Sequence, residues 1–138
     1  MKIDMSKEWL RASKLDLESV KYIIEAEHLT PIVAFHSQQS IEKSFKAIIE
    51  YQNKRIPKQH DLLKLKKNIE NFLDIEEKDN DTLDILNKLY IDSRYPSSFG
   101  LLPYGKPTIE DAKEFYKLAI EIFDKTCSLL GIDNKELL

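Results

Sequence analysis

Glycine is scarce in this chain of 138 residues, and its three copies all lie after residue 99. Tight hairpin turns depend on glycine, because it adopts positive φ values at little steric cost. The sequence also lacks the alternation of apolar and polar residues that is typical of half-buried strands. These two features together predict an all-α fold.

The length and composition predict a single domain over residues 1–138. Hydrophobic residues make up 42% of the chain and charged residues 33%, which is too apolar for a disordered chain and too charged for a membrane protein. No apolar run approaches the roughly 20 residues that a membrane helix needs, and the N-terminus has no signal-peptide core. We therefore expect a cytoplasmic protein that does not contact the membrane.

The formal net charge of −3 argues against a protein that coats nucleic acid through bulk positive charge. Cys127 is the only cysteine, so the chain can form neither an internal disulfide nor a cysteine-based zinc site. The three histidines are scattered and form no metal-binding motif. We expect neither a metal nor a cofactor.

Proline and asparagine positions divide the chain into five predicted helices. Thr30 is the expected N-cap of the second helix, Thr108 opens a capping box, and Gly131 ends the last helix. The pattern predicts an up-down bundle of four to five helices. The first, second and last should share a core that contains Trp9, Phe45 and Phe115. The predicted helices span about residues 5–27, 31–53, 61–72, 81–92 and 108–130.

The second predicted helix carries a polar stripe opposite its apolar face. At 100° per residue the stripe spans about 80° of the helix. It is open to two interpretations, a solvated helix face or a surface that binds phosphate. Gln38 falls inside the apolar arc and Glu42 on its margin, and we expect both to have structural roles as buried, hydrogen-bonded groups. The stripe consists of His36, Gln39, Lys43, Lys46 and Glu50.

Asp16 lies near the middle of the apolar stripe of the first predicted helix. A carboxylate in that position should be paired with a cation. Arg94 extends the inward face of the fourth helix by one turn, which predicts an Asp16–Arg94 pair, with a lysine of the second helix as the competing partner. His60 stands at a helix boundary and is a candidate for acid–base chemistry near neutral pH.

Several motifs occur in a specific order along the chain: AFHSQQSIEKSFKA at 34–47, PKQHDL at 57–62, SRYP at 93–96 and TIEDA at 108–112. Together with Trp9, Ala12 and Asp16 near the N-terminus, this ordered set resembles the HEPN domain family over about residues 5–130. HEPN domains are small nucleotide-binding helical domains of prokaryotes and higher eukaryotes. The resemblance implies a bundle of four or five helices that is usually a homodimer.

The resemblance also implies a biological setting. Stand-alone HEPN proteins are often encoded beside a minimal nucleotidyltransferase and act with it as a toxin–antitoxin pair. Many branches are metal-independent ribonucleases with an R-x(4–6)-H motif. Arg55 and His60 have that spacing, but Ile56 replaces the usual polar residue and Pro57 interrupts the string. We interpret this match as coincidental, and no histidine follows Arg94.

Three functions follow from the resemblance. The first is a homodimeric module that binds a nucleotide or an RNA phosphate. The second is a toxin ribonuclease, with His60, Arg94 and His36 as the catalytic candidates. The third is a docking partner for the nucleotidyltransferase that binds no ligand. The expected ligand-binding residues are His36, Gln39, Lys43, Lys46, His60, Arg94 and Tyr95.

Overall fold

The computed structural model describes residues 2–92 and 105–137. The described residues contain five α-helices, which make up more than half of the chain, and no β-strand, which confirms the predicted all-α bundle. Three short 3₁₀ helices, η1 (Glu27–Leu29), η2 (Glu77–Asp79) and η3 (Asn134–Leu137), lie outside them. The α-helices are α1 (Lys2–Lys21), α2 (Thr30–Tyr51), α3 (Leu62–Ile69), α4 (Asn80–Asp92) and α5 (Ile109–Leu130).

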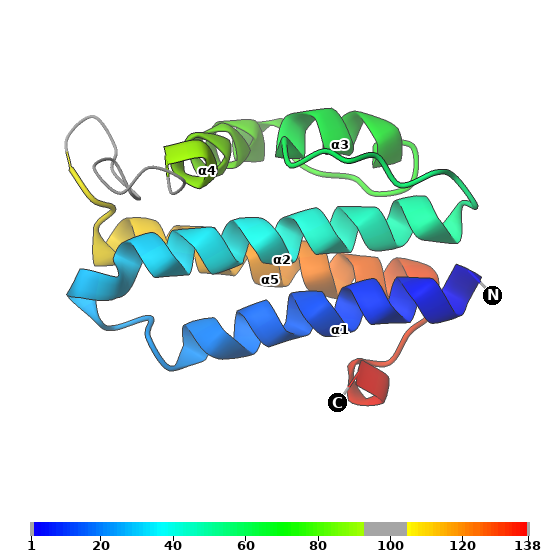
Figure 1. The fold of residues 1–138 in the computed structure, drawn as a ribbon, viewed down its shortest axis with the longest axis horizontal. Helices are drawn as coiled ribbons and strands as arrows, with labels where there is room; N and C mark the ends of the chain where they lie inside the picture. Colours follow the sequence, from blue (N-terminus) through cyan, green and yellow to red (C-terminus); the bar gives the residue numbers. More distant parts are fainter. Residues whose placement is uncertain (1, 93–104, 138) are drawn as a thin grey trace.

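Helix α2 is the centre of the bundle and packs against each of the other four helices. Figure 1 shows α1 and α5 on one side of α2, and α3 and α4 on the other. Ile41 and Phe45 of α2 are fully buried. Phe115 of α5 lies in the same cluster, and Trp9 of α1 packs against it while partly buried, so the predicted shared core is confirmed.

Helices α1 and α2 meet through a cluster of four fully buried serines, Ser6, Ser13, Ser40 and Ser44. Ser13 donates to the carbonyl of Ser40 at 2.8 Å, and its Oγ lies 2.8 and 3.1 Å from the Oγ atoms of Ser40 and Ser44. Ser6 donates to the carbonyl of Ala47 at 2.8 Å. Because serine is small, the two backbones approach closely, and these bonds satisfy the buried hydroxyls.

The first helix ends earlier than its sequence pattern predicts. It stops at Lys21 instead of continuing to about Glu27. The amides of Tyr22 and Ile23 bond to carbonyls three residues back, at 3.3 and 3.0 Å, so the last turn tightens and the chain reverses toward α2. The apolar spacing continued past the helix end because Ile23 still packs against a small buried cluster.

The predicted N-cap role of Thr30 is wrong. Thr30 is the first residue of α2, and Leu29 occupies the cap position without a side-chain bond. The Thr30 hydroxyl donates to the carbonyl of Pro107 at 2.6 Å. It therefore ties the start of α2 to the segment that leads into α5, a long-range contact that the local sequence does not encode.

The signals that the sequence predicts at the two ends of α5 are both present. The side chain of Thr108 and that of Asp111 form the predicted capping box, and Gly131 ends α5 in the left-handed region with φ 67°. The third helix is shorter than predicted and ends at Ile69. Asp61 is its N-cap and not its first residue, since the carboxylate accepts bonds from the next two free amides.

Two expectations from the sequence concern residues outside the described part of the chain. One is the pair between Asp16 and Arg94, which lies there together with Tyr95. The other is that four apolar residues of the proline-bounded segment 96–107 are buried on the core or under a partner, namely Phe99, Leu101, Leu102 and Tyr104. Within residues 2–92 and 105–137, no helix is both long enough and apolar enough to cross a membrane.

The serine cluster generates a test of the close α1–α2 packing. Replacing Ser13 with leucine should lower the free energy of unfolding by about 1–3 kcal/mol or more, because the larger side chain forces the helices apart. The same change at the exposed Ser19, on the same helix, should stay within about 0.5 kcal/mol. Urea denaturation measures both, and equal effects would contradict close packing at Ser13.

Candidate functional site

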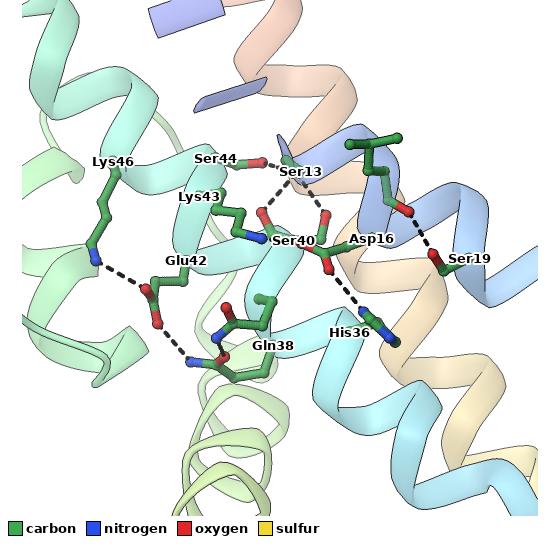
Figure 2. A network of polar contacts seen from close by, with 12 residues as sticks. Ser13, Asp16, Ser19, His36, Gln38, Ser40, Glu42, Lys43, Ser44 and Lys46 are labelled. Atoms are coloured by element: carbon green, nitrogen blue, oxygen red, sulfur yellow. Dashed lines mark hydrogen bonds and ion pairs between the residues drawn. The ribbon is translucent and has the colours of Figure 1, made fainter. Parts of the chain in front are cut away.

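Two buried carboxylates organise the polar side chains around α2. Asp16 comes from α1 and Glu42 from α2 itself, and each is bound by one lysine and one histidine. Figure 2 shows Asp16 facing His36, and Glu42 facing Lys46. Acidic side chains are rarely buried unless they are paired. These pairings therefore explain how both carboxylates can lie inside the bundle.

The Asp16 carboxylate joins two side chains of α2. Its Oδ1 lies 2.8 Å from Nδ1 of His36, and its Oδ2 accepts a bond from Nζ of Lys43 at 2.8 Å. His36 and Lys43 are seven residues apart, which is about two helical turns and puts them on one face. Their side chains are 29% and 23% exposed, so both still reach solvent. The competing prediction, a lysine of the second helix as the partner of Asp16, is confirmed.

The Glu42 carboxylate lies deeper. Its Oε2 accepts a bond from Nζ of Lys46 at 2.9 Å, and its Oε1 lies 3.0 Å from Nδ1 of His60. The Lys46 side chain is only 8% exposed, and its ammonium group lies 5.5 Å from the centre of the Trp9 ring. A solvated face is therefore the wrong interpretation for this part of the stripe. The lysine is enclosed because α2 is covered on this side as well.

Gln38 joins the site to the loop before α3. Its Nε2 donates to Glu42 at 3.2 Å and to the main-chain carbonyl of His60 at 3.0 Å, while its Oε1 accepts from Gln39 at 2.7 Å. The amide is fully buried and hydrogen-bonded, as its place in the apolar arc predicted. Its consequence is that His60 is held by both its ring and its backbone, although its side chain is 48% exposed.

Both histidines use the same ring nitrogen toward a carboxylate. An ionised carboxylate only accepts hydrogen bonds, so the contacts place a proton on Nδ1 of His36 and of His60. Nε2 is then the remaining polar atom of each ring. It accepts a proton when the ring is neutral, and it donates to an anion when the ring is protonated. The arrangement can therefore bind phosphate or take part in proton transfer.

A row of aromatic rings connects the two histidines. Phe35 contacts His36 edge to face, with ring centres 5.5 Å apart, and stacks on Tyr90 of α4 at 6.1 Å. Tyr90 in turn lies 5.1 Å from the ring of His60. Sequence reasoning did not select Phe35 or Tyr90 as site residues. The sequence did place both residues next to selected ones, because Phe35 precedes His36 in the motif and Tyr90 lies one turn before Arg94.

A pocket of about 250 Å³ opens beside His60, between the loop that precedes α3 and the end of α4. His60 and Tyr90 contribute two rings to its wall. Its lining consists of Lys58, Gln59, His60, Asp61, Asn87, Tyr90 and Ile91.

Other reactive side chains do not join this site. Arg55 is exposed and forms no hydrogen bond or ion pair with another described residue. Burial raises the pKa of the Cys127 thiol to about 11, so the thiol stays protonated at neutral pH and is a poor nucleophile. In residues 2–92 and 105–137, no three histidine, cysteine or acidic side chains are grouped so that they could hold a metal ion.

Comparison with known proteins identifies the family. The model of the HEPN domain matches residues 6–130. The chain belongs to the HEPN domain family. The resemblance carried by the sequence motifs is thus confirmed, and membership supports a function connected with nucleotides or RNA. Searches of curated proteins and of solved structures found no significant match to this HEPN domain.

The two carboxylates should differ in their contribution to stability. Glu42→Gln should lower the free energy of unfolding by about 3–5 kcal/mol, because it leaves the ammonium group of Lys46 buried without a counter-charge. Asp16→Asn should cost less, about 1–2 kcal/mol, because Lys43 and His36 can turn toward water.

The matched control is Asp84→Asn on α4. Asp84 and Lys88 form a pair with the same four-residue spacing, but both side chains are exposed. The control should change stability by no more than about 0.5 kcal/mol. Thermal or urea unfolding of the three variants measures the order. A Glu42→Gln variant as stable as the control would show that Lys46 is not enclosed.

Proposed function

We propose that this HEPN domain binds the phosphate of a nucleotide or RNA at the surface formed by His36, Lys43 and His60. The observation that carries the proposal is the pair of partly exposed imidazoles, each held at Nδ1 by a buried carboxylate. Because buried carboxylates orient the two partly exposed rings, the Nε2 atom of each ring is positioned to contact a ligand. Phosphate oxygens are suitable partners, because protonated imidazole and ammonium groups donate strong charge-assisted bonds to them.

The ligand-binding residues predicted from the sequence divide by exposure. Lys43 can share its ammonium protons between Asp16 and a ligand, because its side chain is partly exposed. Lys46 is enclosed, and we assign it the role of fixing Glu42, and through Glu42 the ring of His60. Gln39 is partly buried beside the site. Arg94 and Tyr95, which complete the proposed set, follow α4 directly in sequence.

The charge balance of the site favours a selective ligand over bulk attraction of polyanions. Asp16 and Glu42 offset the charges of Lys43 and Lys46. A net positive charge among these described groups therefore arises only when His36 or His60 is protonated. Such a site recognises an anion through placed hydrogen bonds, which agrees with the overall net charge of −3.

The family resemblance supports the biological setting that we propose. This HEPN domain would form a homodimer in the cytoplasm and act with a minimal nucleotidyltransferase as a toxin–antitoxin pair. Closed two-fold dimers are the commonest homo-oligomers of soluble proteins. In this setting, the nucleotidyltransferase would act on the phosphate-binding surface or cover it.

A second candidate function is metal-independent RNA cleavage. The observation that favours it is the contact from Oε1 of Glu42 to Nδ1 of His60 at 3.0 Å. With its proton fixed on Nδ1, a neutral imidazole presents Nε2 as a general base, and Arg94 would stabilise the charge that develops on the phosphate.

Titration with ATP, GTP and a short single-stranded RNA tests the binding function. We expect saturable binding that Lys43→Gln weakens about tenfold, the loss of one charge-assisted contact. Lys113→Gln is the matched control, since Lys113 on α5 is also an ion-paired surface lysine and should not change the affinity. The absence of saturable binding to all three ligands would overturn the proposal.

The same RNA separates the module from the enzyme. The second function would be established if the unmodified protein cleaves the RNA and the His60→Ala variant binds the RNA without cleaving it. Binding without cleavage would leave the binding module.

A further inference from the structure

We propose that residues 132–137 form a displaceable strap over a docking face on α1, and that this face binds an acidic, partly apolar segment of a protein partner when the strap leaves it. The strap contains η3 and follows α5 directly. Figure 1 shows η3 below α1 and α2 above it. The docking face is separate from the phosphate-binding surface, because Asp16, which holds His36, lies about 200° around α1 from Lys14.

Three cations of α1 hold the strap. Lys7, Arg11 and Lys14 follow one another at spacings of four and three residues, which places them on one face of the helix. Nζ of Lys7 lies 2.9 Å from Oε2 of Glu136. Arg11 donates to the main-chain carbonyl of Glu136 at 3.4 Å. Lys14 donates to the carbonyl of Asn134 at 3.1 Å. The cations therefore bind one carboxylate and two carbonyl oxygens of the strap.

Two apolar side chains anchor the strap beside these cations. Ile132 and Leu137 are 5% and 4% exposed, and both belong to the core cluster that contains Leu10 of α1. Leu10 comes three residues after Lys7, so it borders the row of cations on the helix surface. The docking face therefore combines an apolar centre with a charged rim, which is the usual composition of a protein-binding surface.

The polar contacts of the strap are of a kind that opens readily. The side chains of Lys7 and Glu136 are 27% and 44% exposed, and ion pairs that reach solvent add little stability because water and salt screen them. The bond from Arg11, at 3.4 Å, is long. A short segment with few buried contacts opens locally, at a lower free energy than global unfolding. The strap can therefore leave α1 while the helices stay folded.

The strap shows which chemistry the docking face accepts. Its apolar side chains, Ile132 and Leu137, are five residues apart, and the carboxylate of Glu136 lies beside the second. The hydrogen bonds from Lys7 and from the amide of Asp133 lower the pKa of Glu136, so this carboxylate is ionised at neutral pH. A protein segment can supply the same groups. A nucleic acid has no aliphatic side chains for the two apolar positions, so the face favours a protein.

The strap regulates the docking face by competition. A partner segment can bind only to those molecules in which the strap is open, so its apparent affinity falls in proportion to the open fraction. The contact between η3 and α1 is therefore autoinhibitory, and weakening it should raise the affinity of the face for a partner.

The test uses the full chain and a peptide with blocked ends and the sequence IDNKEL, that of residues 132–137. In the strap variant, Leu137→Ser and Glu136→Gln remove the apolar anchor and the carboxylate, and they leave the docking face on α1 intact. We expect the strap variant to bind the peptide at least about tenfold more tightly than the unmodified protein does. Fluorescence anisotropy of the labelled peptide measures both affinities, and circular dichroism checks that both proteins are folded.

Substitutions in α1 locate the binding. Added to the strap variant, Lys7→Gln and Lys14→Gln together should weaken peptide binding by about tenfold or more, because two charge-assisted contacts are lost. Lys21→Gln is the matched control, since Lys21 is an exposed, ion-paired lysine of the same helix outside the docking face. The peptide IDNKQS, which lacks the carboxylate and the second apolar side chain, is the control ligand and should not bind.

If the strap variant does not fold, hydrogen exchange of the unmodified protein replaces it. The amides of Asp133, Lys135 and Glu136 are bonded within the strap. They should exchange faster than the amides in the last turns of α5, and an excess of the peptide IDNKEL should speed their exchange further. Exchange at the same rate as α5, without an effect of the peptide, would overturn the inference.

Tighter binding to the strap variant that requires Lys7 and Lys14 supports the inference. Equal binding to both proteins, or no binding to the strap variant, overturns it. A short RNA that binds the docking face of the strap variant when the peptide does not would also overturn it. So would a mass in light scattering that rises with concentration for the unmodified protein alone, because two copies would then exchange straps. None of these outcomes changes the phosphate binding proposed at His36 and His60.

Discussion

The burial of α2 on nearly all sides is the constraint on which the rest of the structure depends. A central helix normally consists of apolar residues, yet the polar side chains of Gln38, Glu42 and Lys46 on α2 are buried. Each of these groups must find a partner, because an unpaired buried charge costs several kcal/mol. The partners they find determine the geometry of the site: Glu42 and Gln38 together fix His60. The same hydrogen bonds therefore satisfy the buried polar groups of α2 and fix the position of His60.

Local signals in the sequence predicted what local physics determines. The scarcity of glycine predicted the all-α fold, and the Thr108 capping box and Gly131 predicted the ends of α5. Burial of Gln38 followed from its place in the apolar arc. The enclosure of Lys46 could not be predicted, because a helical wheel divides a helix into one buried and one exposed face. Helix α2 instead packs against other helices on both sides.

The contacts of the histidines were also beyond the sequence pattern. The loop after α2 places the ring of His60 against a carboxylate 18 residues earlier, and nothing in the spacing indicates this pairing. For Asp16 the pattern correctly required a cation, and the structure shows Lys43 and His36 in contact with its carboxylate. Membership of the HEPN family supports a nucleotide- or RNA-related function, and we propose that these contacts connect that function to particular atoms of this chain.

Buried carboxylates fix the orientation and the proton position of two partly exposed imidazoles, those of His36 and His60. Nitrogen NMR of the histidine side chains, at a pH where the rings are neutral, measures this proton position directly. We expect His36 and His60 to carry their proton on Nδ1, whereas the exposed His28, which has no carboxylate contact in the described residues, should not show this preference. A proton on Nε2 of His36 and His60, or the same mixture of forms in all three histidines, would contradict the claim.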